Sequence, residues 1–226
     1  MSLEREKQLA AESAAELVEE SMRIGLGTGS TAAFAIRRLG ERVAQGLSIT
    51  AVPTSLQSER LAREVGIPLI DFSDVISLDM TLDGADEFDP ALNLTKGGGG
   101  ALFREKIVAA ASDRLIIFAD HTKQVQQLGK FPLPVEVNPF GWQVAAGKIE
   151  ALGPKVTLRQ GSSGPFTTDN QGYILDCEFG EIPDPPALER QLAAIAGVTE
   201  CGLFCAMAEI ICMGEGESVR HITPRA

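Results

Sequence analysis

Short apolar segments alternate with helix-forming stretches through the first 120 residues, and this alternation restricts the chain to few folds. Loops rich in glycine or polar residues follow three of these segments. The pattern predicts a parallel, doubly wound α/β sheet, whose ligands bind beyond the carboxyl ends of its strands. The predicted strands cover residues 22–26, 48–52, 67–71, 76–82 and 114–119.

The order of elements changes at Phe131, where Pro132 and Pro134 mark a boundary. Beyond them the pattern is strand, helix, strand, strand, helix, strand, which is the order of a ferredoxin-like α+β unit. The apolar segment EIICMG, residues 209–214, is expected to rejoin the first sheet. We therefore predict a Rossmann-like domain of residues 1–130 and 206–226, and a smaller ferredoxin-like domain of residues 131–205.

The chain is acidic, with 20 lysines and arginines against 31 aspartates and glutamates and a net charge of −11. This charge repels nucleic acid and anionic membrane surfaces, so neither is expected as a partner. No apolar run reaches the roughly 18 residues of a transmembrane helix, and the N-terminus lacks the form of a signal peptide, which favours a cytoplasmic location. The four cysteines show no C-x-x-C spacing and the histidines number two, so we predict no metal site and buried thiols in a reducing compartment.

A glycine-rich turn lies between the first predicted strand and the next helix. Gly25, Gly27 and Gly29 allow close approach of the backbone, and Ser30 and Thr31 open the helix. Amides at a helix N-terminus favour phosphate, although the hydroxyl residues of this turn could also simply cap the helix. The dinucleotide fingerprint G-x-G-x-x-G is absent, because Ser30 occupies its last glycine position.

The stretch from residue 83 to 106, DGADEFDPALNLTKGGGGALFREK, has the composition of a site for a small anionic substrate. Asp83 and Asp86 open it, Lys96 precedes four glycines, and Glu105 lies in the second turn of a predicted helix. The same residue types are common in solvated turns, and a charged helix face is the ordinary explanation for the charges around Glu105. Four successive glycines are entropically costly, however, which favours a loop that approaches a ligand closely.

Lys123 follows the predicted strand 114–119. An isolated lysine is usually a solvated surface residue. In a parallel sheet, however, its position would bring it to the same edge as Thr28, Asp83 and Lys96.

Four motifs together resemble those of the type A ribose 5-phosphate isomerases: GTGST at 27–31, DGADE at 83–87, KGGGG at 96–100 with REK at 104–106, and GKFPLPVEV at 129–137. The resemblance covers nearly the whole chain in order and spacing, and includes TDN at 168–170. It implies a Rossmann-like domain with a ferredoxin-like lid, no cofactor, no metal, and a homodimer or homotetramer. Gly100 stands where a small residue such as alanine is expected, which should not disturb the site, and the tail after Cys205 matches poorly.

The resemblance also implies the activity and the residues that carry it. It implies interconversion of D-ribose 5-phosphate and D-ribulose 5-phosphate through a cis-enediolate, within the non-oxidative pentose phosphate pathway. Glu105 is implied as the proton-transfer base, with Asp83 and Lys96 as catalytic partners. The implied phosphosugar contacts are Thr28, Gly29, Ser30, Thr31, Asp83, Gly84, Ala85, Asp86, Lys96, Gly97, Gly98, Gly99 and Lys123.

Other functions fit parts of the same pattern. A non-catalytic sugar-phosphate sensor could use the same sheet edge, but no segment remains for a DNA-binding helix pair, and the net charge of −11 opposes DNA binding. A CoA transferase-like enzyme could use Glu105 as a nucleophile. An NAD-dependent reductase is disfavoured by the glycine spacing.

Overall fold

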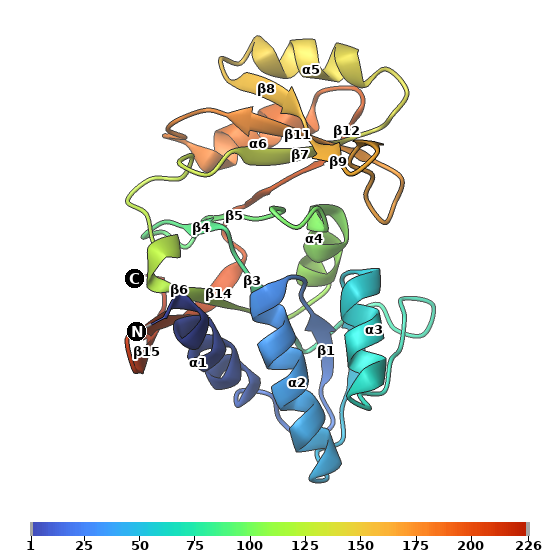
Figure 1. The fold of residues 1–226 in the computed structure, drawn as a ribbon, viewed down its shortest axis with the longest axis vertical. Coiled ribbons are helices and arrows are strands. Elements are labelled where there is room, and N and C mark those ends of the chain that lie inside the picture. Colours follow the sequence, from blue (N-terminus) through green and yellow to red (C-terminus); the bar gives the residue numbers. More distant parts are fainter. Residues whose placement is uncertain (1, 225–226) are drawn as a thin grey trace. The chain divides into compact units, whose positions relative to one another are not determined.

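The computed structural model describes residues 2–224, which form two compact units (Figure 1). The first unit contains the described residues as far as Ala85, then Arg104–Gln124, and the described residues from Met207 onward. The second contains Asp86–Phe103 and Val125–Ala206. Residues 86–103 thus belong to the second unit, whereas the sequence analysis assigned them to the first domain.

A six-stranded sheet forms the centre of the first unit. Its strands lie in the order β15-β14-β6-β3-β1-β2, and all pairs are parallel except β14 with β15. The predicted parallel sheet is confirmed, but residues 67–71 form only one isolated bridge, between Leu69 and Ala51. The strands are β1 (Arg23–Leu26), β2 (Thr50–Pro53), β3 (Met80–Gly84), β6 (Leu115–Asp120), β14 (Ala208–Glu215) and β15 (Ser218–Ile222).

Helices cover both faces of this sheet. Small and branched residues of α1 and α2 pack with Met80 and Leu82 in the main core, whereas Val108 of α4 packs with Val52 and Leu78. Thr81 lies between Met80 and Leu82 on β3, and its Oγ1 donates to Val108 O at 3.4 Å. Because neighbouring side chains of a strand point to opposite faces, α4 lies on the other face from α1 and α2. The helices are α1 (Leu3–Ala15), α2 (Ser30–Ala44), α3 (Leu56–Glu64), α4 (Leu102–Ala110) and the short 3-10 helix η1 (His121–Lys123).

The C-terminal segment completes the sheet of the first unit. β14 contains the EIICMG segment and runs parallel to β6, with Ile211 opposite Ile117 and Cys212 opposite Phe118. The expectation that this segment rejoins the first sheet is therefore confirmed. β15 then folds back antiparallel to β14 as a hairpin.

A four-stranded antiparallel sheet with two helices forms the main body of the second unit. Its order β12-β7-β11-β8 is that of a ferredoxin-like unit, as predicted. Buried Val135, Leu175 and Cys177 of the sheet pack with Ile149 and Leu192 of its helices. The elements are β7 (Leu133–Val137), α5 (Trp142–Glu150), β8 (Lys155–Leu158), β11 (Tyr173–Glu178), α6 (Pro185–Ala193) and β12 (Val198–Cys201).

Two smaller sheets complete the second unit. β5 pairs antiparallel with both β4 and β13, so the segment before the glycines is held by a strand more than a hundred residues later in the chain. This pairing is the physical reason why residues 86–103 belong to the second unit. The remaining strands are β4 (Glu87–Phe88), β5 (Leu94–Thr95), β13 (Leu203–Phe204), β9 (Gln160–Gly161) and β10 (Gly164–Pro165). Among residues 2–224, no helix has the length and apolar character needed to cross a bilayer.

Candidate active site

The glycine-rich turn after β1 opens the N-terminus of α2. Gly29 is the N-cap residue, with φ of 108°, and no side chain caps the helix there. The hypothesis that a hydroxyl of this turn merely caps α2 is therefore wrong. Gly27 is required for a different reason, because a Cβ at this position would lie 2.1 Å from the Asp83 carboxylate. The turn thus presents the first amides of α2 at the carboxyl edge of the sheet, which is a favourable place for an anion.

A cluster of hydroxyl groups supports this turn from within the first unit. Thr28 Oγ1 lies 2.7 Å from Thr54 Oγ1 and donates to Ser55 Oγ at 2.8 Å. Ser58 Oγ in turn donates to the carbonyl oxygen of Gly27 at 2.6 Å. The sequence analysis missed Thr54, Ser55 and Ser58, although the N-cap pattern of Ser55, which accepts from Ser58 N, is a signal that could have drawn attention to them.

Asp83 lies at the end of β3 with its carboxylate beside the same turn. Its side chain is buried, and Oδ1 accepts hydrogen bonds from Thr28 N at 3.2 Å and from Gly84 N at 2.8 Å. Because side chains alternate along a strand, Asp83 points to the same face as Thr81. Thr81 Oγ1 contacts Val108 O and Ser112 Oγ, so Asp83 faces the side of the sheet that α4 covers.

Glu105 is a buried acid on α4. Val108 of α4 lies beside Thr81 of β3. Ala111 and Ser112, which follow α4, pair with Leu78, which precedes β3, so α4 runs antiparallel to β3. Glu105 precedes Val108 by one turn on the same helical face, so it lies toward the end of β3 that carries Asp83. Ile107 is 44% exposed, because the buried face of α4 contains Glu105 and Val108.

Lys123 follows β6 at the same edge of the sheet. β6 pairs with β3, with Phe118 opposite Gly84, and ends at the buried Asp120, whose Oδ1 accepts from Thr122 N at 3.0 Å and caps η1. Lys123 is the last residue of η1 and is half-buried. A second ammonium group, that of Lys7, lies 4.0 Å from Asp120 Oδ2. The edge that receives the glycine-rich turn therefore carries positive charge from two elements.

The second unit holds the remaining predicted site residues. Asp86 Oδ2 accepts a hydrogen bond from Gly98 N at 2.7 Å, and a Cβ at Gly98 would lie 2.6 Å from Asp86 Oδ1. The buried Lys96 places its ammonium 5.3 Å from the centre of the Phe204 ring. Its backbone N donates to Gly202 O at 2.8 Å. These contacts therefore hold Asp86, Lys96 and the glycine loop (residues 97–100) in place within the second unit.

Comparison with known proteins identifies the family. A sequence profile described as ribose 5-phosphate isomerase A (phosphoriboisomerase A) matches residues 50–218. The chain belongs to the ribose 5-phosphate isomerase A family. A relative of that name from Gloeobacter violaceus is 51% identical over 228 aligned positions, with 100% of this chain and 99% of the relative covered. One from Ruegeria sp. (strain TM1040) is 50% identical, with 95% of this chain and 85% of the relative covered.

Solved structures of ribose 5-phosphate isomerase share the fold. A D-ribose-5-phosphate isomerase in complex with phospho-erythronic acid is 41% identical, with a TM-score of 0.96, and the match covers 99% of this chain and 100% of that one. Ribose 5-phosphate isomerase A from Methanocaldococcus jannaschii is 37% identical, with a TM-score of 0.94, and the match covers 98% and 100% of the two chains.

Buried hydrogen bonds in the second unit connect the motifs DGADE, GKFPLPVEV and TDN of this member of the ribose 5-phosphate isomerase A family. The buried Glu87, from DGADE, accepts from Gly129 N at 2.9 Å and from Phe131 N at 2.7 Å, which joins it to the GKFPLPVEV motif. Thr168, from TDN, donates to Glu136 Oε1 at 2.7 Å in the same motif. These residues link segments distant in sequence, so they support the framework of the site through buried hydrogen bonds.

The glycine loop of this family member has no room for a side chain at Gly100. Its φ is 79°, and a Cβ would lie 2.4 Å from Phe166 Cε1. Gly97 also has positive φ, of 98°, and a Cβ there would lie 2.8 Å from Leu102. Gly100 is therefore fitted to Phe166, a relation that the sequence analysis did not foresee.

Gly100→Ala is expected to destabilise the second unit by about 1–3 kcal/mol, because the methyl group overpacks against Phe166 and prefers negative φ. Thermal or urea unfolding measures the loss. Gly147→Ala is the matched control, since Gly147 lies in α5 with open space around its Cβ position, and it should gain about 0.5–1 kcal/mol. Trimming the ring in Gly100→Ala/Phe166→Leu should recover part of the loss; equal destabilisation in the single and double variants would contradict the packing explanation.

A titratable pair joins α1 to the end of β6 in the first unit. Glu6 Oε2 lies 2.6 Å from His121 Nδ1, and Glu6 Oε1 accepts from Gly216 N at 3.0 Å. The hydrogen bond from His121 and then that from Gly216 lower the pKa of Glu6. The hydrogen bond to Glu6, together with the charges of Asp120 and Glu215, raises the pKa of His121.

The Glu6–His121 pair should stabilise the protein most between about pH 4.5 and 6.5, the ordinary pKa values of the two groups. The contribution of His121 is complete below 6.5 and is lost as the pH rises through its raised pKa. The contribution of Glu6 is complete above 4.5 and is lost as the pH falls through its lowered pKa. Thermal unfolding of wild type and Glu6→Gln from acid to alkaline pH should give a Tm difference that is largest in this window and shrinks as the pH rises through the raised pKa of His121.

The control for this pH dependence is Glu209→Gln. Glu209 pairs with Arg114 at 2.9 Å, and this arginine does not titrate in the range. Its Tm difference should stay level from about pH 5 to 9. If the Tm difference for Glu6→Gln also stayed constant with pH, the charge on His121 would contribute nothing to the stability of the Glu6–His121 pair.

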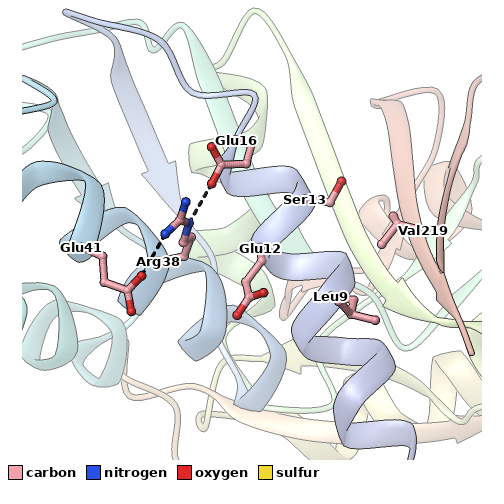
Figure 2. Close-up of a pocket in the computed structure, with 7 residues that line it drawn as sticks. All are labelled: Leu9, Glu12, Ser13, Glu16, Arg38, Glu41 and Val219. Carbon is pink, nitrogen blue, oxygen red and sulfur yellow. Dashed lines mark hydrogen bonds and ion pairs between the residues drawn. The ribbon is translucent and has the colours of Figure 1, made fainter. Parts of the chain in front are cut away.

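Figure 2 shows the residues that line a hollow in the first unit. The hollow has a volume of about 480 Å³, and the predicted site residues are not among those that line it. Arg38 reaches across it from α2 and donates to Glu16 at 2.7 Å and to Glu41 at 3.0 Å. These exposed ion pairs contribute little to stability. The hollow is lined by Leu9, Glu12, Ser13, Glu16, Arg38, Glu41 and Val219.

Proposed function

We infer that this chain interconverts D-ribose 5-phosphate and D-ribulose 5-phosphate through a cis-enediolate, a step of the non-oxidative pentose phosphate pathway. The observation that carries the inference is the full-length match to the isomerase solved with phospho-erythronic acid. That compound is a phosphorylated sugar acid, and its carboxylate resembles the two oxygens of an enediolate. The residues that match the family profile include three of the four motifs that carry the resemblance, at 83–87, 96–106 and 129–137.

The reaction needs one base that serves two neighbouring carbons. The base takes the proton from C2 of the open-chain aldose, the C–H electron pair becomes the C1–C2 double bond, and charge moves to O1. A proton then moves from O2 to O1, the electron pair on O2 forms the C2 carbonyl, and the C1–C2 double-bond pair takes the proton back from the base at C1, which gives the ketose. We propose Glu105 as this base, because it is a buried carboxylate directed to the carboxyl end of β3, and burial favours a stronger base than a solvated glutamate.

Asp83 is proposed to move hydroxyl protons and to assist opening of the sugar ring. Its Oδ1 is already engaged by Thr28 N and Gly84 N, which fixes the orientation of the carboxylate. A fixed carboxylate loses little entropy when the substrate binds, and this is a general source of rate enhancement. We propose Gly84 and Ala85, which follow Asp83, as contacts of the sugar.

Lys96 and the amides of Gly97 and Gly99 are proposed to stabilise the negative charge that develops on the sugar oxygens. Preorganised donors at such positions are often the largest single contribution to catalysis. Asp86 holds the amide of Gly98, so we propose that it orients the glycine loop as well as a sugar hydroxyl.

The phosphate is proposed to bind at the open N-terminus of α2, with Lys123 supplying positive charge. The N–H and hydroxyl of Thr28 already donate to Asp83 and Ser55, so its main part is to hold the turn. Gly29, Ser30 and Thr31 then provide the direct contacts through their amides and hydroxyls. Binding of the phosphate far from the reacting carbons positions C1 and C2 over the base.

One assay tests the activity directly. Purified protein is mixed with ribose 5-phosphate without additives, and ketose formation is followed. Catalytic turnover to ribulose 5-phosphate is expected; binding of the sugar without turnover would favour a sensor. Covalent labelling of Glu105 by an acyl-CoA would favour the transferase alternative.

We further propose a cytoplasmic homodimer, or a homotetramer. Three of the four cysteines are buried, no disulfide joins them, and burial raises the pKa of Cys177 and Cys212 to about 12, which suits a reducing compartment. In the second unit, Phe140 is 93% exposed and Val144 63%, as is common at subunit contacts. Sedimentation equilibrium tests the assembly; a monomer at micromolar concentration would contradict it.

A further inference from the structure

Arg159 follows β8 in the second unit and holds the glycine loop through its backbone. Its Nη1 donates to Gly97 O at 3.1 Å and to Gly98 O at 3.0 Å. The other edge of the guanidinium forms a two-pronged ion pair with Asp176 on β11, in which Nε lies 2.9 Å from Oδ2. The side chain is 16% exposed, and its central carbon lies 5.8 Å from the centre of the Phe166 ring.

These contacts fix the orientation of two successive peptide groups. In a trans peptide the N–H points opposite to the C=O. Binding of Gly97 O and Gly98 O by one cation therefore directs the N–H groups of Gly98 and Gly99 away from Arg159. The hydrogen bond from Gly98 N to Asp86 is consistent with this orientation, because it places Asp86 on the side of the peptide opposite to Arg159.

The charge of Arg159 also acts on the strength of these donors. A cation on a carbonyl oxygen polarises the whole peptide group, so the attached N–H becomes a better hydrogen-bond donor. Phe166 shields the guanidinium from solvent, and Asp176 holds its orientation toward the two carbonyl groups. A lysine could supply the charge, but not a planar fork that binds two carbonyl oxygens and a carboxylate together.

We propose that Arg159 is a positioning residue for the isomerase reaction, which acts through the peptide groups of Gly97 and Gly98 to hold the glycine loop and to aim and strengthen the Gly99 amide, which binds the enediolate. The proposal rests on the function inferred above for the glycine loop. Arg159 itself touches no reacting atom. Its removal should affect the charged intermediate more than the substrate, because donor strength matters most where charge develops.

The test compares Arg159→Met with Lys155→Met. Lys155 makes the neighbouring ion pair between β8 and β11, at 2.9 Å from Glu178, but is exposed. Arg159→Met should lower kcat about 10- to 100-fold, less than deletion of a direct oxyanion donor, with KM changed by less than about 3-fold. Its inhibition constant for phospho-erythronic acid should rise about 10-fold or more, while that for inorganic phosphate stays within about 2-fold. Lys155→Met should leave all four constants near wild type.

Asp176→Asn separates positioning from simple stabilisation. It weakens the ion pair but leaves the guanidinium on the glycine loop, so Tm should fall while kcat stays within about 3-fold of wild type. The kcat of Arg159→Lys should lie between those of Arg159→Met and the wild type. If Arg159→Met does not fold, Arg159→Lys is compared with the wild type in its place. Circular dichroism at the assay temperature ensures that folded protein is compared.

Two results would overturn the proposal. One is wild-type kcat in Arg159→Met, or in Arg159→Lys where only that variant folds. The other is a kcat loss that follows Tm equally in the Arg159 and Asp176 variants, which would reduce Arg159 to a structural role. Absence of ketose formation by the wild-type protein would instead refute the proposed function, so the two failures are distinguishable.

Discussion

Glu105→Gln is expected to lower kcat for ribose 5-phosphate by about 10³-fold or more, because general base catalysis by one residue contributes up to about 10⁴-fold. Glutamine has nearly the same shape as glutamate but cannot accept the proton from C2. Binding of the phosphosugar should remain within a few-fold of wild type, since the proposed phosphate contacts do not include Glu105. Stopped assays of ketose formation give the rate, and competitive inhibition by phospho-erythronic acid reports on the site.

Isotope exchange makes the test of Glu105 specific to proton transfer. In D₂O the wild type should exchange the transferred hydrogen of the sugar with solvent, and Glu105→Gln should not. The matched control is Glu59→Gln, which changes a half-buried acid in the first turn of α3 that pairs with Arg63 at 2.9 Å. Exchange and turnover at wild-type rates in Glu105→Gln would remove Glu105 from the mechanism.

Lys96→Ala should lower kcat about 10²-fold while KM changes by less than about 3-fold, because its charge is needed most when the enediolate forms. The ammonium is buried and lies against Phe204, so it is held in place before the substrate arrives. Steady-state kinetics over a range of ribose 5-phosphate concentrations separates the two constants.

Removal of the Lys96 side chain also removes packing, so Lys96→Met is needed beside the alanine variant. Methionine keeps an apolar stem against Phe204 without the charge, and it should be as slow as alanine. Lys148→Ala, at an exposed position in the last turn of α5, should behave as wild type. A rise in KM without loss of kcat would make Lys96 a contact of the phosphate or a hydroxyl group.

The sequence predicted the features that depend on local patterns. The parallel sheet follows from strand and helix periodicity, and the position of Asp83 at the end of β3 follows from where an apolar segment stops. The ferredoxin-like order of the second unit was also predicted, because its strands and helices have proline, glycine or polar residues at one end or at both.

Features that depend on pairing across the chain were not predictable in this way. The segment with Lys96 belongs to the second unit because Thr95 pairs with Leu203, and no local signal marks such a partner. The same holds for the hydroxyl cluster under Thr28 and for Arg159, whose role depends on distant carbonyl groups. Gly100 looked like an interchangeable small residue until Phe166 was placed beside it.

The position of β14 has a consequence for how the protein is made. This strand comes near the end of the chain but lies inside the six-stranded sheet, between β6 and β15. Until it has left the ribosome, the largely apolar β6 has an unpaired edge, which is the type of surface that other nascent chains can join. The sheet of the first unit therefore keeps this edge open until the whole segment Val125–Ala206 and then β14 have been synthesised.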